Sequence, residues 1–265
     1  MTTKLIVLIL GSWPIAQLWA DPPELLRVIR NVQDVEPSRS YADARIAVNV
    51  LGMRAVSGLD EAWLMEMHDT FASIEDVDQA LASVRPVMNS KASANLASGD
   101  VLPPARSLIA LYRPALSYRP DEAAKNLAKA HYLLISIYRI LPGNEDVFSE
   151  MIKLRRVRGD SINLDRPEIA YEVIAGAMSS TYVFVAPFPT LKILDDGLAK
   201  TPAYAESARD AGKKATAQAD ISQERMLLRI DRGLSYVSDD FASGNPEFWN
   251  PSSTFQNPAL PSRAR

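Results

Sequence analysis

The sequence predicts an α+β protein built from two consecutive units, each with the strand and helix order βαββαβ. Two observations predict this fold. Alternating apolar residues mark four short strands in each half, and short segments recur in the same order: residues 116–118 (LSY) return at 234–236, and 55–58 resemble 173–176. The order βαββαβ is that of the ferredoxin-like split βαβ motif, an antiparallel sheet with helices on one face. The sequence therefore predicts two tandem ferredoxin-like domains.

The first domain is predicted over residues 21–120. Its four strands are expected at residues 24–30, 49–57, 61–68 and 107–113, with the middle two forming a hairpin around Gly58. A short helix is expected near residues 41–47. A second helix is expected to begin at Thr70, because apolar residues follow it at helical spacing: Ile74, Val77, Leu81 and Val84.

The second domain is predicted over residues 121–242 and begins with a polar, helix-prone linker at residues 120–129. Its strands are expected at residues 132–139, 169–174, 181–186 and 226–230. Asn144 is expected to cap a helix, Thr190 to begin a short one, and Thr201-Pro202 to open a longer one. The first domain has fewer residues between its first strand and its hairpin, so its first helix is expected to be the shorter.

The N-terminus predicts export. Residues 1–20 contain Lys4, an apolar stretch and no acidic residue, and Asp21-Pro22-Pro23 follows directly. This pattern indicates a secretory signal peptide cleaved after Ala20, with an uncleaved membrane anchor as the alternative. We therefore expect a periplasmic or extracellular protein with no stable membrane span after cleavage.

The C-terminal residues 243–265 are rich in proline, with Pro246, Pro251, Pro258 and Pro261. They lack apolar periodicity and are expected to form an extended tail. The aromatic pair Phe248-Trp249 is the exception. It is expected to pack onto the adjacent domain, or alternatively to serve as a recognition motif for a partner.

Composition excludes several classes of site. The chain has no cysteine, which excludes disulfides, thiolate metal sites and cysteine nucleophiles, and only two histidines, which excludes a three-histidine zinc site. With 29 Lys and Arg against 32 Asp and Glu, the net charge of −3 does not favour a nucleic-acid partner. No phosphate loop, dinucleotide fingerprint or nucleophile elbow is present. We expect no cofactor and no metal.

Several segments carry a resemblance to known proteins. Residues 57–64 (SGLDEAWL), 68–72 (HDTFA) and 112–118 (YRPALSY) resemble a group of exported bacterial proteins without assigned function, as do 236–238 followed by 248–249. At fold level the halves resemble the dimeric α+β barrel group, which includes NIPSNAP domains and antibiotic-biosynthesis-type monooxygenases. The resemblance implies that the two halves pack as an intrachain dimeric α+β barrel, and it implies no activity. The shortened first helix departs from the group.

The first domain offers one candidate polar site. Alternation along residues 62–68 places Trp63, Met65 and Met67 on one face of the sheet and Leu64, Glu66 and His68 on the other. Glu66 and His68 could line a ligand pocket with Arg54, and Arg27 and Arg113 lie on the outer strands. The alternative is structural: a solvated His68 at the strand end beside Asp69, and a Glu66 that pairs with an arginine across the sheet.

The second domain places polar residues within its strands: Ser136, Tyr138, Tyr171, Glu172 and Arg229. They could ring a small-molecule cavity, or their hydroxyl groups could reach the sheet edge in ordinary packing. No counterpart of Glu66 is found here, since Val185 or Ala186 takes its place. The basic residues Lys153, Arg155, Arg156 and Arg158 are expected to form a solvated helix face, with an anion site as the alternative.

These observations predict a small-molecule-binding or interaction module rather than an enzyme. The alternative is a cofactor-free or haem-using oxygenase with His68 and Trp63 as its special residues. We expect a monomer with an intrachain pseudo-dimer, or a weak homo-oligomer.

Overall fold

The computed structural model describes residues 21–32, 37–57, 60–84, 106–199 and 221–250. The first half contains β1 (Leu25–Arg30), α1 (Pro37–Asp43), β2 (Asn49–Ala55), β3 (Ala62–His68), α2 (Phe71–Val84), β4 (Arg106–Tyr112) and a 3₁₀ turn at Pro114–Leu116. The second half contains α4 (Pro120–Leu127), β5 (Tyr132–Arg139), α5 (Glu145–Ser161), β6 (Ile169–Ala175), β7 (Thr181–Phe188), α6 (Lys192–Ala199), β8 (Ser222–Ile230), α8 (Asp239–Ala242) and α9 (Pro246–Trp249).

The eight strands close into one barrel in the order β1-β3-β2-β8-β5-β7-β6-β4. Neighbouring strands are antiparallel throughout. Each half supplies four adjacent strands, and the halves meet at two seams, β2 with β8 and β4 with β6. The predicted mixed fold with a closed barrel is confirmed. Because both edge strands of each half are paired, neither half leaves an open edge at the seams.

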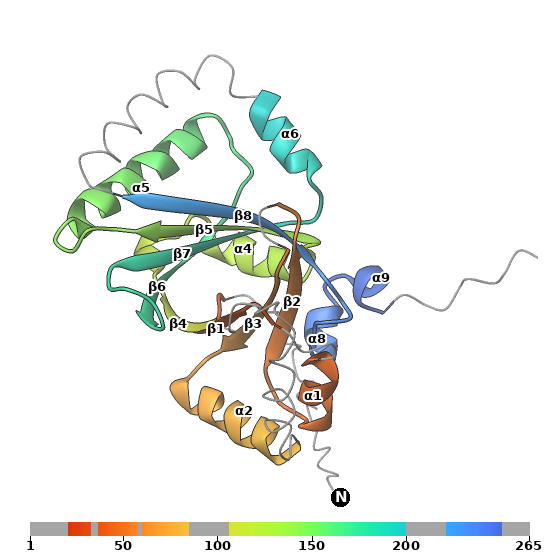
Figure 1. The fold of residues 1–265 in the computed structure, drawn as a ribbon. Helices are drawn as coiled ribbons and strands as arrows, with labels where there is room; N and C mark the ends of the chain where they lie inside the picture. Colours follow the sequence, from red (N-terminus) through yellow and green to blue (C-terminus); the bar gives the residue numbers. More distant parts are fainter. Residues whose placement is uncertain (1–20, 33–36, 58–59, 85–105, 200–220, 251–265) are drawn as a thin grey trace, which may run out of the picture.

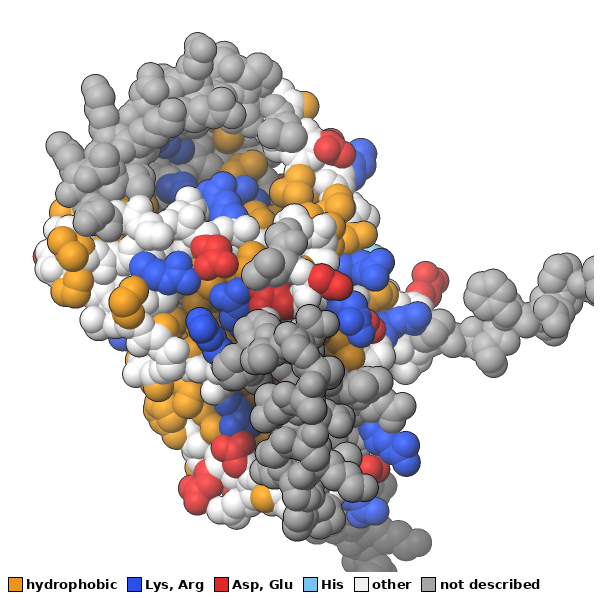
Figure 2. Space-filling model, viewed as in Figure 1, with side chains coloured by type: hydrophobic (Ala, Val, Ile, Leu, Met, Phe, Trp, Pro, Cys, Tyr) orange, Lys and Arg blue, Asp and Glu red, His pale blue; other side chains and the backbone are white. Residues whose placement is uncertain are grey.

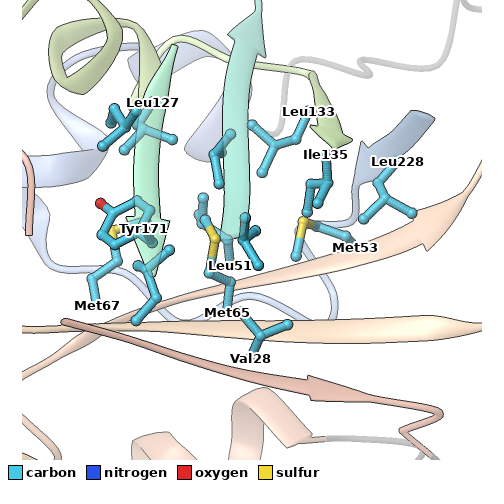
Figure 3. Close-up of a cluster of buried hydrophobic side chains, with 14 of the residues drawn as sticks. Val28, Leu51, Met53, Met65, Met67, Leu127, Leu133, Ile135, Tyr171 and Leu228 are labelled. Carbon is cyan, nitrogen blue, oxygen red and sulfur yellow. The ribbon is translucent and has the colours of Figure 1, made fainter. Parts of the chain in front are cut away.

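Alternation along the strands fills the barrel interior with apolar side chains from both halves (Figure 3). Val28, Met53 and Met65 of the first half pack there with Ile135 and Leu228 of the second. Leu127 of α4 joins this cluster beside Tyr171 and Met67, so α4 is part of the core and not only a linker. Removing this much apolar surface from water is the main force that holds the halves together.

Outside the barrel, α5 lies on the half-sheet of the second half, and α1 and α2 lie on that of the first (Figure 1). An apolar layer lies beneath the helices of each half. In the second half, Phe148 and Ile152 of α5 pack on Phe184 of β7. In the first half, Tyr41 of α1 and Val77 of α2 pack near Leu64 of β3. The first helix of the first half is shorter than its counterpart, 7 residues in α1 against 17 in α5, as the sequence predicted. α1 therefore covers less of its sheet.

Some elements differ from the predicted positions. α1 begins at Pro37 and ends at Asp43, four residues earlier than expected, because Pro37 suits a first helical position and Arg45 has a left-handed φ of 51° that ends the helix. β8 begins at Ser222 rather than 226, since it pairs with β5 along its full length. The helix expected after Thr201-Pro202 lies outside the described residues.

The end of the described chain packs onto the barrel. α8 and α9 follow β8, so residues 246–249 are helical rather than extended; residues 251–265 lie outside the described ranges. The Trp249 indole Nε1 donates to the Ala128 carbonyl at 2.8 Å, and the Phe248 ring stacks on His131 with centroids 4.4 Å apart. The aromatic pair therefore packs on the domain, as the first of the two interpretations predicted.

No helix within the described ranges is both long and apolar enough to span a membrane.

Candidate functional site

β3 separates two environments because its side chains alternate between its faces. Trp63, Met65 and Met67 point into the barrel, as the apolar cluster they share shows. Leu64 belongs instead to the layer beneath α1 and α2, and Glu66 and His68 lie on that same outer face. This distribution is the one that the sequence predicted.

Six polar residues form what we call the Glu66 cluster: Arg27, Tyr41, Glu66, His68, Ser73 and Asp78. The register of β1 with β3 places Arg27 directly opposite Glu66. Arg27 Nε donates to Glu66 Oε2 at 2.5 Å and Arg27 Nη2 to Oε1 at 3.1 Å, while Arg27 Nη1 reaches Asp78 Oδ1 at 2.5 Å. The Tyr41 hydroxyl donates to Glu66 Oε1 at 2.6 Å. Glu66 thus pairs with an arginine across the sheet, as the structural alternative predicted.

His68 is buried, with 0% of its side chain exposed, so the expectation of a solvated strand-end histidine is wrong. The reason is α2, which begins at Phe71 and covers the ring. His68 Nε2 lies 3.0 Å from Glu66 Oε2 and Nδ1 lies 2.8 Å from Ser73 Oγ. The Ser73 hydroxyl hydrogen is already directed at the Thr70 carbonyl, 2.8 Å away. Both ring nitrogens therefore have a hydrogen-bond partner within the cluster.

The charged groups of the Glu66 cluster are paired with one another. Burial alone would raise the pKa of Glu66, but hydrogen bonds from His68 and Arg27 lower it below its ordinary value. Burial alone would lower the pKa of Arg27, but Glu66 and Asp78 raise it. Arg27 thus faces two carboxylates, and His68 makes a further hydrogen bond to one of them. This internal pairing is typical of a structural ion-pair network.

Ser73, His68 and Glu66 follow one another through hydrogen bonds, as the members of a catalytic triad do. In a triad the imidazole must accept the serine proton. Here the Ser73 hydroxyl donates to the Thr70 carbonyl at 2.8 Å instead. The proton that a serine nucleophile would give to the imidazole is therefore directed away from His68.

The candidate Arg54 lies away from this cluster, at the β2–β8 seam opposite Arg229. Arg54 Nε donates to Asp231 Oδ2 at 2.7 Å. Burial alone would raise the pKa of Asp231, but the hydrogen bond from Arg54 lowers it. Glu172 lies at the other seam, where Arg113 Nε donates to its Oε2 at 2.6 Å. Both candidates therefore belong to partly exposed ion pairs at the two joins of the barrel.

Tyr171 points into the barrel interior, the opposite face of the sheet from Ser136 and Tyr138. Its buried hydroxyl has no hydrogen-bond partner in the part of the chain that the structure describes, and burial raises its pKa well above the ordinary value. Tyr171 is thus excluded from the predicted ring of polar residues.

The outer face of the second half carries a second polar group, which we call the arginine cluster: Tyr138, Arg155, Arg166, Glu168, Gln223 and Arg225. Arg155 of α5 donates to the Tyr138 hydroxyl at 2.9 Å and pairs with the Glu168 carboxylate. With the Gln223 amide oxygen turned toward its donors, it accepts from Arg225 Nε and from the Tyr138 hydroxyl, each at 2.7 Å. Tyr138 therefore links the helix to β8.

The charges of the arginine cluster do not balance. Three guanidinium groups face one carboxylate, Glu168, among residues with a described position. Burial lowers the pKa of Arg166; the charge of Glu168 raises it, and the like charges of Arg155 and Arg225 lower it further. The net shift is downward, with burial as its largest cause.

Two predicted residues, Ser136 and Arg229, share the outer face with this cluster. Ser136 of β5 lies opposite Arg225 of β8, and Arg229 follows four residues later on the same side of β8. Figure 2 shows Lys and Arg side chains close together near α5 and β8. The structure therefore brings Ser136, Tyr138 and Arg229 to one face and leaves Glu66 and His68 on the other half-sheet.

The sequence interpretation missed Arg155, Arg166 and Arg225. Arg155 was expected on a solvated face, yet it follows Phe148 and Ile152, the buried residues of α5, at helical spacing. That spacing was a signal for a side chain that points toward the sheet. Arg166 lies in the connection between α5 and β6, where no periodicity marks it.

The described residues contain no group of three or more His, Cys, Asp and Glu side chains placed to hold a metal ion. Haem bound through His68 does not fit, because both ring nitrogens are hydrogen-bonded beneath α2. Trp63 lies on the opposite face of β3, so the two residues named for an oxygenase do not line one cavity.

No family model matches the chain, and no curated protein matches it. Among solved structures, it is similar to a proposed monooxygenase from Lactobacillus acidophilus, at 10% identity and a TM-score of 0.45, over 81% of this chain and 96% of that one. It is also similar to a chlorite dismutase variant from Candidatus Nitrospira defluvii, at 9% identity and a TM-score of 0.42, over 82% and 95%. A third, a haem-binding protein from Thermus thermophilus, gives 9% identity and a TM-score of 0.40, over 79% and 95%. Likenesses at these identities and TM-scores carry no argument about the family or the activity of this chain.

Proposed function

We propose that the chain is a non-catalytic small-molecule-binding module whose ligand lies on the outer face of β5 and β8, beside α5. The observation that carries the proposal is the unbalanced arginine cluster, in which Arg155 joins Tyr138 and Glu168, Gln223 joins Tyr138 and Arg225, and Arg166 lies within reach of their charges. An uncompensated, partly buried cation lowers stability unless a ligand or solvent supplies the missing charge. Binding sites are a common reason for such an arrangement.

The face also offers the mixture of groups that small ligands use. Ser136 and Tyr138 carry hydroxyl groups, and Leu134 lies opposite Leu227 between the polar residues of β5 and β8. A few directed polar groups beside apolar side chains are typical of ligand sites.

The proposal is tested by native mass spectrometry of the purified full chain, with Ser136→Trp as the variant that fills the face. We expect a co-purified or added ligand to bind the parent chain and the control Ser83→Trp, which makes the same change at an exposed position of α2. Binding should be lost in Ser136→Trp and in Arg225→Glu, the second variant in case tryptophan disturbs folding. Binding that survives both variants would place the ligand elsewhere and overturn the proposal.

The non-catalytic part of the proposal has its own test, labelling with a fluorophosphonate that reacts with activated serines. We expect Ser73 to stay unlabelled, because its hydroxyl hydrogen is directed at Thr70. Labelling that depends on His68 would show a working serine nucleophile and end the non-catalytic assignment.

We further propose that the barrel consists of two tandem ferredoxin-like domains that act as an intrachain pseudo-dimer. The repeated strand order supports this: the fourth, first, third and second strands of each half are neighbours. A fragment of residues 121–242 would lose the partners of β8 and β6, so it should aggregate or form a homodimer. A soluble monomer by light scattering would contradict the proposal.

We also propose that the protein is exported and that residues 1–20 are removed after Ala20. The charge and apolar pattern of this segment supports the proposal. The test is the N-terminal sequence of the protein recovered from the periplasm or medium of an expressing cell. A chain that stays in the cytoplasm with Met1 or Thr2 at its N-terminus would contradict it.

A further inference from the structure

Arg166 differs from its neighbours in the arginine cluster. Arg155 is held by Tyr138 and Glu168, and Arg225 by Gln223. Arg166 alone of the three makes no side-chain hydrogen bond or ion pair with any residue in the described ranges. A guanidinium carries five N–H donors in a planar fork. Among the described residues, none takes up these donors.

The charge around Arg166 sets the charge of that ligand. Three guanidinium groups against the single carboxylate of Glu168 leave a surplus of two positive charges among the described residues. A monoanion such as a carboxylate would neutralise half of this surplus, whereas a dianion would neutralise all of it. Arginine also suits phosphate oxygens, because its parallel N–H groups can bind two of them at once.

The surface beside the cluster suits an organic substituent. Leu134 of β5 and Leu227 of β8 lie opposite each other. Two residues along the strands, on the same face, are the pair Ser136–Arg225 in one direction and the pair Tyr132–Arg229 in the other. Both leucines are only partly buried. An apolar group attached to the anion could therefore cover them and gain from leaving water.

We propose that the site recognises a phosphate monoester: the phosphate docks on Arg166 with Arg155 and Arg225 beside it, and the organic group lies over Leu134 and Leu227. This inference rests on the proposed function and names the ligand class for the same site. The phosphate is bound and not transferred, so no bond of the ligand is broken.

The experiment is isothermal titration of the full chain with inorganic phosphate, sulfate, acetate and phenyl phosphate at constant ionic strength. We expect phenyl phosphate to bind most tightly, phosphate and sulfate to bind less tightly, and acetate to bind least. Arg166→Gln should weaken phenyl phosphate binding at least about tenfold, the effect typical of losing a charged hydrogen bond. Arg225→Gln should weaken it less. Arg45→Gln removes the same charge from an exposed position of the first half and should leave affinity unchanged.

A pH series tests the requirement for a dianion. From about pH 8 to about pH 5 phosphate gains a proton and becomes largely a monoanion, whereas sulfate remains a dianion. The groups that face the anion are Arg155, Arg166, Arg225, Glu168 and Tyr138. We expect phosphate to weaken relative to sulfate across this range. An unchanged ratio, or acetate that binds as tightly as sulfate, would overturn the phosphate inference.

The source of the monoester is tested with vesicles that contain phosphatidic acid, whose headgroup is a phosphate monoester. Sedimentation with these vesicles that is lost in Arg166→Gln would identify a lipid ligand. Phenyl phosphate binding without vesicle binding would identify a soluble one. If no anion binds while Ser136→Trp still abolishes binding of a co-purified ligand, the phosphate inference fails and the proposed function stands.

Arg166→Gln and Arg225→Gln are each checked for folding by circular dichroism before titration. Should Arg166→Gln fail to fold, Arg166→Lys keeps the charge but loses the fork. It should bind phenyl phosphate more weakly than the parent chain does, and equal affinity would contradict the inference.

Discussion

The Glu66 cluster and the arginine cluster occupy corresponding places, each on the outer face of one half-sheet beneath the helices of that half, yet they differ in charge balance. In the first, Arg27 and His68 make buried hydrogen bonds to Glu66, and Arg27 also pairs with the more exposed Asp78. In the second, three arginines face one carboxylate and the Arg166 guanidinium makes no hydrogen bond within the described ranges.

This difference separates a structural network from a candidate binding site. A buried charge is tolerated when opposite charges and hydrogen bonds replace the water it loses. The Glu66 cluster meets that condition within the chain itself. The arginine cluster, as far as the structure describes it, does not, and its missing charge is what a ligand could supply.

The largest expected effect is the loss of Glu66. Glu66→Gln leaves Arg27 buried without its carboxylate, so we expect the free energy of unfolding to fall by about 3–5 kcal/mol. The measurement is urea denaturation followed by circular dichroism. Glu172→Gln, which breaks the partly exposed pair with Arg113, should change it by less than about 1 kcal/mol. Equal losses of unfolding free energy in Glu66→Gln and Glu172→Gln would show that the Glu66 cluster contributes no more to stability than the exposed pair of Glu172 and Arg113.

A double-mutant cycle measures how strongly Arg27 and Glu66 depend on each other. The double variant Arg27→Met/Glu66→Gln should lose less unfolding free energy than the sum of the losses in the two single variants. The difference should be about 0.5–3 kcal/mol. The reason is that each single variant leaves one buried charge without its main partner, whereas the double variant removes both charges of that pair. Strict additivity in urea denaturation would contradict the pairing.

The lowered pKa of Glu66 predicts how stability depends on pH. Because the pKa is lower in the folded protein than the ordinary value of 4.5, folding favours the ionised carboxylate. The stabilisation is fully present above the unfolded pKa and is lost as the pH falls through the folded one. Urea midpoints measured down to acidic pH should fall more steeply for the parent chain than for Glu66→Gln. Parallel curves would indicate that Glu66 is not responsible.

The smallest effect is expected at Arg166. Arg166→Gln removes a partly buried cation that has no partner in the described ranges, so stability should be unchanged or should rise by up to about 1 kcal/mol. Added sulfate should raise the melting temperature of the parent chain more than that of this variant, since ligand binding stabilises the folded state. A loss of several kcal/mol would make Arg166 structural and reverse the comparison.

Local patterns in the sequence determined much of this protein. Alternation located the strands and placed Glu66 and His68 on the face opposite Trp63, because side chains change sides at every residue of a strand. The repeated segments predicted the two halves, and the number of residues between strand and hairpin predicted that the first helix of the first half is the shorter. These properties depend on neighbours in the chain.

Only the tertiary structure decided which charges meet. The register of β1 with β3 places Arg27 opposite Glu66. The packing of α1 and α2 on the sheet brings Tyr41, Ser73 and Asp78 into the same cluster. The docking of α5 turned Arg155 toward the sheet, where the α5–β6 connection and β8 bring Arg166 and Arg225 close to it. These partners come from segments far apart in the chain, and electrostatic energy depends on distance and burial, which no local pattern of residues specifies.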